Sequence, residues 1–199
     1  MLTLHWLWPW SRINALEEQA RYLMRLSTHD PLTGLLNRRG GDEVLAHHFS
    51  MLSRNNCEKN DFAVLDLDLD RFSGINDKYG HSVGDQVLVF FTKVLVGILR
   101  NNEHDIVVRL GGDEFRIILP ECSFEHGEIV KTKIKDALMA TAFEVSGIKL
   151  SLRTSVGVAT ARTPRSNEVR QIEEILKLAD KAMYEDKAAG YALRNSEER

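Results

Sequence analysis

The sequence has few cysteines and almost no net charge, and each scarcity excludes a class of protein. Only Cys57 and Cys122 are present. Two such distant thiols match neither a disulfide framework nor a zinc motif, so we expect a reducing, cytoplasmic compartment. The net charge of -3 gives no general attraction to polyanions, which argues against a nucleic-acid-binding protein. A phosphate-bearing ligand would have to be bound locally or through metal ions.

The sequence also lacks a long apolar run. The longest apolar stretch, MLTLHWLWPW at the N-terminus, is shorter than the about 20 residues that span a bilayer, so we predict no transmembrane span. It has neither the basic start nor the small-residue cleavage site of a secretory signal. All three tryptophans, Trp6, Trp8 and Trp10, lie in this stretch. They indicate either a weak contact with a membrane or partner, or simply a frayed terminus or packing against the domain.

What remains fits one globular domain with a short N-terminal appendage. The 199 residues, 43% of them hydrophobic and 28% charged, can bury a single core. Apolar residues at three- and four-residue steps predict an amphipathic helix over residues 11–26 that could form a coiled-coil seam. The seam residues are Ile13, Leu16, Ala20 and Leu23. We place the domain boundary near Thr28, with the appendage at 1–28 and the domain at 29–195.

The domain alternates helical and strand patterns. Helical stripes occupy 41–54, 87–98, 125–141 and 168–188, and strand patterns occupy 62–70, 106–110, 114–120 and 149–161. In the first strand, FAVLDLDLD, leucine alternates with aspartate, so the leucines share one face and the carboxylates the other. We expect a polar turn after this strand, and a hairpin at Gly111 and Gly112. This order predicts an α+β fold with helices over a mostly antiparallel central sheet.

Carboxylates gather at two places that such a sheet can bring together. Asp68 lies near the end of the first strand, and Asp113 and Glu114 follow the two hairpin glycines. Hard oxygen ligands with no histidine or cysteine nearby favour Mg²⁺ or Mn²⁺ over zinc. Because Mg²⁺ usually bridges to substrate phosphates, the cluster indicates a nucleoside triphosphate site. The alternative is that the glycines only form a hairpin turn and the acids are solvated.

A calcium-binding EF-hand loop is excluded more firmly. The stretch DLDLDRFSGIND has the spaced acids of such a loop. However, Arg71 stands where the loop needs glycine, and Asp77 stands where it needs glutamate.

Four blocks of the sequence resemble one known family in their order and spacing. The stretch RLGGDEF, from Arg109 to Phe115, is similar to the signature of the GGDEF family of diguanylate cyclases. DPLTGLLNRR from Asp30, DLDRFSGINDKYGHSVGD from Asp68 and ADKAMYEDKAAG from Ala179 resemble further blocks of that family. The resemblance implies a palm-like fold akin to nucleotidyl cyclases. It also implies a homodimer in which each domain binds one GTP.

The resemblance further implies which residues carry the chemistry. Asp68, the carbonyl group of Leu69 and Asp113 would hold the metal ions, with Mg²⁺ as the expected cofactor and Mn²⁺ as a substitute. Asp113 and Glu114 would be the catalytic residues. Asp113 would act as a metal ligand, and Glu114 would assist the metal or help to deprotonate the attacking hydroxyl group.

The substrate contacts implied by the resemblance are Asn76 and Asp85 for guanine and Lys187 for phosphate. A carboxylate and an amide suit guanine, which offers N–H donors and acceptors. Each residue also has a simpler interpretation. Asn76 is typical of a turn, Asp85 of the beginning of a helix, and Lys187 of a solvated charge near a helix end.

Two cations that are common in the family are missing. Ser73 stands where the family has a lysine that contacts phosphate, and Tyr191 stands where it has an arginine. Arg71 and Arg194 lie nearby in the sequence and could substitute.

The product-inhibition motif of the family is also incomplete. This motif, RxxD, aligns with Asn102 and Asp105, so its arginine is absent. Because the planar donor is lost, we expect weak or absent feedback inhibition.

Three functions follow from these observations. The first is a Mg²⁺-dependent diguanylate cyclase that joins two GTP molecules into cyclic di-GMP as a homodimer, promoted by the helical seam over 11–26. The second, favoured by Ser73 and Tyr191, is a degenerate module that binds GTP for regulation without forming product. A purely structural dimerisation module is disfavoured, because the site acids would then have no purpose.

Overall fold

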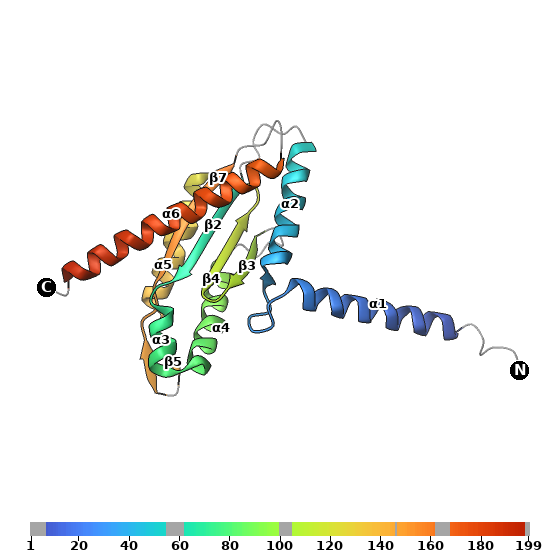
Figure 1. Ribbon diagram of the computed structural model, residues 1–199, viewed down its shortest axis with the longest axis horizontal. Coiled ribbons are helices and arrows are strands. Elements are labelled where there is room, and N and C mark those ends of the chain that lie inside the picture. Colours follow the sequence, from blue (N-terminus) through green and yellow to red (C-terminus); the bar gives the residue numbers. More distant parts are fainter. Residues whose placement is uncertain (1–6, 55–61, 100–104, 146, 162–167, 198–199) are drawn as a thin grey trace, which may run out of the picture.

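The computed structural model describes residues 7–54, 62–99, 105–145, 147–161 and 168–197 (Figure 1). The elements in chain order are α1 (Leu7–Thr28), β1 (Leu36–Asn37), α2 (Arg38–Arg54), β2 (Phe62–Leu69), α3 (Phe72–Tyr79), α4 (His81–Ile98), β3 (Ile106–Gly111), β4 (Glu114–Leu119), α5 (Phe124–Ala140), β5 (Phe143–Val145), β6 (Ile148–Leu150), β7 (Thr154–Ala161) and α6 (Glu168–Glu197).

The central sheet has five strands in the order β1-β3-β4-β2-β7. Strand β1 pairs with β3 in parallel, and the other neighbours are antiparallel. Strands β5 and β6 form a separate two-stranded ribbon. The predicted α+β fold, with helices over a mostly antiparallel sheet, is therefore confirmed.

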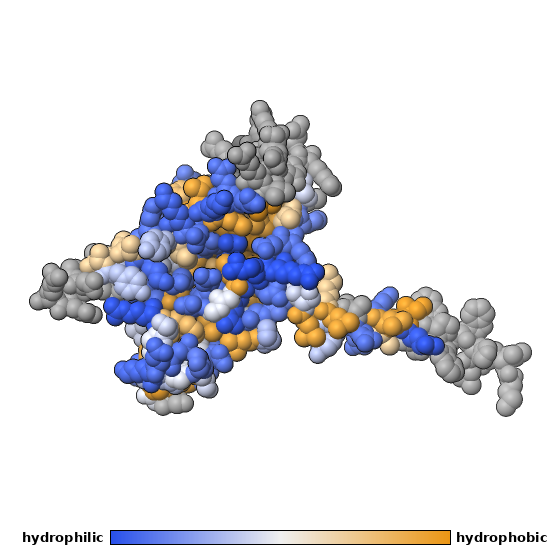
Figure 2. All heavy atoms as spheres, viewed as in Figure 1, coloured by the Kyte–Doolittle hydropathy of each residue, from blue (hydrophilic) through white to orange (hydrophobic). Residues whose placement is uncertain are grey.

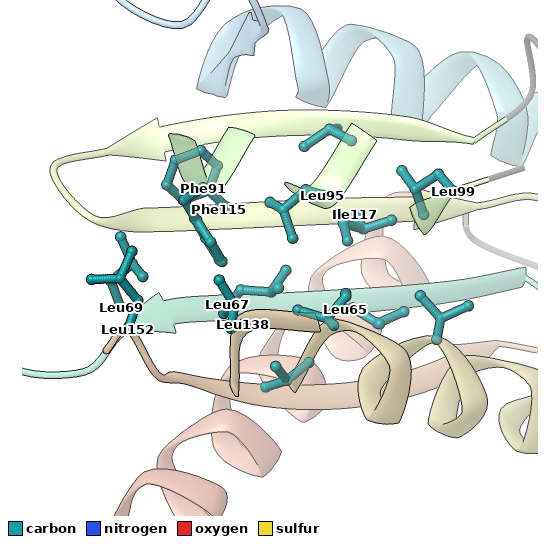
Figure 3. Close-up of a cluster of buried hydrophobic side chains, with 14 of the residues drawn as sticks. Leu65, Leu67, Leu69, Phe91, Leu95, Leu99, Phe115, Ile117, Leu138 and Leu152 are labelled. Carbon is teal, nitrogen blue, oxygen red and sulfur yellow. The ribbon is translucent and has the colours of Figure 1, made fainter. Parts of the chain in front are cut away.

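Helices cover both faces of this sheet, and β2 divides its side chains between them. Leu65, Leu67 and Leu69 pack against Phe91 and Phe115 in the larger core (Figure 3). The alternate residues of β2 belong to the other face, where α2 and α6 pack on the sheet. All eight residues of β2 are buried. The aspartates of the strand therefore point into a covered layer and not into open solvent.

Helix α6 lies unusually close to β7. A Cβ atom on Gly157 would collide with the backbone of α6 at Ala179 and Met183, so only glycine permits this approach. One turn further along α6, Asp186 accepts a 2.9 Å hydrogen bond from the Val156 amide. Burial would raise the pKa of Asp186, but hydrogen bonds, first of all from Lys135, hold it below its ordinary value. These contacts fix the part of α6 that carries Lys187.

Several element boundaries differ from the predictions. The expected polar turn over 72–85 is mostly helical, as α3 and the beginning of α4. The single strand expected over 149–161 is two strands: β6 pairs with β5 and β7 with β2, so the chain changes partner between them. The short strands β1 and β5 were not predicted, because two or three residues show no periodicity. Helix α6 continues beyond the predicted end at Ala188.

Helix α1 projects away from the domain (Figure 1). Ile13, Leu16 and Leu23 of the predicted seam are 47%, 64% and 57% exposed, and apolar residues are visible along the projecting helix (Figure 2). Trp6 lies outside the described residues, and of Trp8 and Trp10 only the backbone is described. The tryptophan contact therefore stays a prediction.

Within the described ranges, one helix is long and apolar enough to cross a membrane by length and composition alone, namely α4. Its apolar stripe, with Val87, Leu88, Phe91 and Leu95, is buried in the larger core. Helix α4 is therefore interpreted as a core helix. Cys122 is also buried, whereas Cys57 lies outside the described residues.

Candidate functional site

The end of β2 and the β3–β4 turn bring the predicted metal ligands together. Asp68 is the cross-strand partner of Glu114 in the β2–β4 ladder, and Asp113 lies in the turn directly before it. The Leu69 amide donates a 3.3 Å hydrogen bond to the Asp113 carbonyl oxygen. From the other side, the Thr154 hydroxyl donates to the Asp68 carbonyl oxygen at 2.9 Å. Hydrogen bonds from two neighbouring strands thus hold the backbone that carries Asp68, Leu69 and Asp113.

The charges at this edge of the sheet favour a cation. Burial raises the pKa of Asp113, and the negative charge of Asp68 raises it further. The Lys187 ammonium group lies 2.6 Å from Asp68 Oδ1. Burial alone would lower the pKa of Lys187, but the hydrogen bond and charge of Asp68 raise it. Asp68 and Asp113 therefore repel each other, and the Lys187 ammonium group partly neutralises their charge.

The donor set fits a hard divalent cation. Asp68, Asp113 and the carbonyl group of Leu69 supply only oxygen atoms, which Mg²⁺ and Mn²⁺ prefer. No group of three or more metal-ligating side chains occurs within the described ranges.

Glu114 lies beside this group and has a different partner. Its side chain is half exposed, with Oε2 3.6 Å from Arg38 Nη2. It lines a cavity of about 440 Å³ between the sheet, α2 and α6. Because the residue faces this cavity, its position agrees better with an assisting role than with a place among the metal ligands.

A buried ion pair, which was not predicted from the sequence, lies on the same two strands as Glu114 and Asp68. Asp66 and Arg116 are cross-strand partners two positions further along the same ladder. They form two hydrogen bonds, of 2.6 and 2.8 Å, and are 3% and 7% exposed. Burial raises the pKa of Asp66 although Arg116 acts in the opposite direction. Because both charges need each other, the pair fixes the register of the strands that carry the site acids.

The predicted guanine contacts lie on neighbouring helices, Asn76 on α3 and Asp85 on α4. The Asn76 Oδ1 atom is buried and has no hydrogen-bond partner among the described residues. It lies against Gly84, where an added Cβ atom would collide with it. Asp85 is the next residue and is exposed. A buried acceptor without a partner is unfavourable, so a ligand with N–H donors would be stabilising here.

Arg109 is a site residue whose role could not be predicted from its place in the RLGGDEF stretch. Its Nε and Nη2 atoms donate to the Gly112 carbonyl oxygen at 3.1 and 2.8 Å. Its Nη1 atom contacts both carboxylate oxygens of Asp30, at 2.9 and 3.0 Å. Asp30 also accepts hydrogen bonds from the Thr33 amide and hydroxyl groups. Arg109 therefore connects the loop that follows α1 to the turn that carries Asp113.

Replacing Arg109 by alanine is expected to lower the free energy of unfolding by about 1–3 kcal/mol, because Asp30 and the Gly112 carbonyl group lose their partner. Urea unfolding would measure this loss of stability.

The loss should depend on pH. Burial would raise the pKa of Asp30, but hydrogen bonds from Thr33 and Arg109 lower it. The stabilisation is therefore present above the ordinary carboxyl pKa and is lost as the pH falls through the lowered value.

The matched control for this variant is Arg39→Ala. Arg39 also pairs with a carboxylate, that of Glu43, but both side chains are at least half exposed. Its loss should cost less than about 0.5 kcal/mol. Equal effects of the two substitutions, or a difference that does not shrink at low pH, would contradict the assigned role of Arg109.

The residues that depart from the family pattern are placed as follows. Ser73 is exposed on α3, and Tyr191 is partly buried on α6. The Arg71 guanidinium carbon lies 5.9 Å from the Tyr191 ring centroid. The Arg194 side chain and Asn102 lie outside the described parts of the structure, so the expected weak feedback inhibition stays a prediction.

The chain is similar to known proteins in both sequence and structure. The sequence model described as "Diguanylate cyclase, GGDEF domain" matches residues 27–192. The chain is 35% identical over 175 residues to the probable diguanylate cyclase DgcC of Escherichia coli, covering 88% of this chain and 44% of that protein. It is 34% identical over 186 residues to the cyclic di-GMP phosphodiesterase NbdA of Pseudomonas aeruginosa, covering 90% of this chain and 22% of that protein. The chain therefore spans less than half the length of these two relatives.

A solved structure gives the same result. The diguanylate cyclase SiaD of Pseudomonas aeruginosa, in complex with its activator SiaC, matches with a TM-score of 0.73 at 31% identity. The match covers 92% of this chain and 69% of that one.

Proposed function

The chain belongs to the GGDEF family of diguanylate cyclase domains, and from this premise we propose that it condenses two GTP molecules into cyclic di-GMP and pyrophosphate. The observation that carries the proposal is the proximity of the two carboxylates Asp68 and Asp113, the first of which is paired with the Lys187 ammonium group. A site built in this way favours a cation, and GTP brings the phosphates that such a cation binds.

The reaction joins the 3′-hydroxyl oxygen of each GTP to the α-phosphorus of the other, and each new bond releases pyrophosphate. Asp68, Asp113 and the Leu69 carbonyl group would hold Mg²⁺ or Mn²⁺. When bound, the metal would lower the pKa of the hydroxyl group and neutralise charge on the transferring phosphorus. Glu114, which lines the cavity, would accept or pass on the hydroxyl proton.

Lys187 has two partners in this proposal. Its ammonium group donates a 2.6 Å hydrogen bond to Asp68. With GTP bound, the same group would turn to the phosphates, because a triphosphate offers more negative charge than one carboxylate. On the other side of the site, Asn76 and Asp85 would bind the N–H donors of guanine.

The proposed reaction requires two copies of the chain, because each domain binds one GTP and supplies half of the site. Helix α1 is suited to join them. Its seam residues Ile13, Leu16 and Leu23 are exposed, and burying them between two parallel helices would stabilise a coiled coil. The proposed homodimer therefore uses α1 to bring the two domains face to face in the cytoplasm.

A second function has its own support, namely a GTP-binding regulatory module without cyclase activity. Ser73 and Tyr191 are uncharged where the family commonly has cations. One relative of similar identity, of which the match covers 22%, is named a cyclic di-GMP phosphodiesterase.

Incubating the purified chain with GTP and Mg²⁺, followed by chromatography of the nucleotides, tests the proposal. Cyclic di-GMP and pyrophosphate are expected, and ATP in place of GTP should give no product. Omitting the divalent cation should abolish turnover. Bound but unconverted GTP would replace the proposed function by the regulatory module, and the absence of GTP binding would contradict both.

A further inference from the structure

Arg71 has an unusual backbone conformation directly after the strand that carries Asp68. Its φ and ψ angles are 60° and 28°, in the left-handed region. Among the described residues other than glycine, only Arg71 and Glu121 have positive φ. This conformation is unfavourable for a residue with a Cβ atom. It bends the chain sharply between β2 and α3 and leaves the Arg71 side chain beside α6.

The Arg71 side chain rests on an aromatic ring of that helix. Its guanidinium carbon lies 5.9 Å from the centroid of Tyr191, within the range of a cation–π contact. Tyr191 follows Lys187 by one helical turn, so both residues lie on the same face of α6. Because Lys187 contacts Asp68, α6 brings an ammonium group and a ring-held guanidinium group to the same end of β2.

The beginning of α3 adds further positive potential at this place. Arg71 is the N-cap residue of α3, and its side chain makes no capping hydrogen bond. The free amide groups at a helix N-terminus carry partial positive charge, so a cation beside them is unfavourable unless an anion is present. Lys187 already has Asp68 as its anionic partner, so a phosphate group at this helix end would interact with Arg71 and with the amide groups of the first turn.

We infer that Arg71, held on the ring of Tyr191, is the second cation that grips the triphosphate of GTP, next to Lys187. The inference rests on the proposed function and selects Arg71 from the two arginines that could substitute for the missing phosphate cations. A guanidinium group suits the role because its planar donors match phosphate oxygens in pairs. The inference also gives Tyr191 a role. Its ring orients the Arg71 guanidinium group, although Tyr191 carries no charge itself.

The test compares GTP with GMP, which share the guanine and differ in the outer phosphates. In calorimetric titrations with Mg²⁺ present, Arg71→Gln should bind GTP about tenfold more weakly, as the loss of one charge-assisted contact predicts. Its affinity for GMP should change less than about twofold. Arg71→Lys should restore part of the GTP affinity. Tyr191→Phe keeps the ring and should resemble the parent chain, whereas Tyr191→Leu should weaken GTP binding.

The matched control is Lys78→Gln. Lys78 is another cation held over an aromatic ring, 5.0 Å from the centroid of Tyr79, but at the other end of α3. Its loss should leave both affinities unchanged. Unchanged GTP binding by Arg71→Gln, or an equal loss for GMP, would overturn the inference.

The same titrations separate this inference from the proposed function. In one outcome, the parent chain binds GTP more tightly than GMP, Arg71→Gln loses that preference, and no cyclic di-GMP forms. This outcome would contradict the cyclase activity and support the contact between Arg71 and the phosphates. If the parent chain and Arg71→Gln form cyclic di-GMP equally well and bind GTP equally tightly, the cyclase activity would be supported and the role of Arg71 would be contradicted. A parent chain that does not bind GTP would overturn both.

Discussion

The Asp113→Asn variant is expected to form cyclic di-GMP at least about a hundredfold more slowly than the parent chain, yet to unfold at a temperature no lower. The activity falls because one charged oxygen ligand is lost where charge develops on the transferring phosphorus. The stability is kept because burial and the charge of Asp68 already raise the pKa of Asp113. Removing that charge relieves the repulsion, and asparagine has nearly the same volume.

Asp68→Asn provides the informative contrast. It should be as inactive as Asp113→Asn, because it removes a ligand from the same proposed site. It should also be less stable, because Lys187 would lose the carboxylate that lies 2.6 Å from its ammonium group. Asp136→Asn, an exposed acid on α5, controls for the change of net charge and should keep both properties.

Initial rates at saturating GTP and thermal melts measured on the same preparations check these expectations. An Asp113→Asn enzyme with a near-normal rate in Mg²⁺ would remove Asp113 from the metal site. A large loss of stability in that variant would show that the carboxylate has a structural partner, and the argument from repulsion would then be wrong.

The sequence was informative wherever a local pattern decides the structure. In β2, a period of two assigns leucines and aspartates to opposite faces regardless of the rest of the fold, and Leu65, Leu67 and Leu69 do lie in the larger core. The pattern did not show that α2 and α6 cover the other face. Asp66 therefore reads as one more exposed acid in the sequence, whereas the fold buries it with Arg116.

The contacts that complete the site join residues far apart in the chain, and no periodicity encodes them. Arg109 and Asp30 are 79 positions apart, and Lys187 and Asp68 are 119 apart. The sequence placed each of these residues in a motif, but their pairing follows from how the loop before α2 and the helix α6 approach the sheet. Short elements escaped prediction for a different reason, since α3 buries only Phe72 of its eight residues.

Gly84 of α4 contacts Asn76 of the short helix α3, and replacing it should have a large effect on GTP binding. Gly84→Ala is expected to weaken GTP binding by about tenfold to a hundredfold, the range for one or two lost hydrogen bonds. The new Cβ atom would collide with Asn76 Oδ1 and lie 3.0 Å from Asn76 Cγ and 3.2 Å from Phe72 Cζ. Because the ring is part of the core, the amide group must move, and the proposed guanine contact moves with it.

Substrate preference reports on this mechanism more directly than affinity alone. Inosine triphosphate lacks the exocyclic amine of guanine, so a site that binds this amine should discriminate against it. The parent chain should prefer GTP, and Gly84→Ala should lose most of that preference. Gly97→Ala is the matched control, because it lies on the same helix and its Cβ atom would meet nothing within 4 Å. It should bind GTP normally and gain up to about 1 kcal/mol of stability from helix propensity.

A double-mutant cycle tests whether Gly84 acts through Asn76. If the added methyl group only displaces the amide, Gly84→Ala should have almost no effect on GTP binding in an Asn76→Ala background, since the smaller side chain leaves room for it. Additive losses in the double variant would mean that the methyl group disturbs α3 and α4 as a whole. An unchanged KM and GTP preference in the single variant would show that Asn76 does not contact guanine.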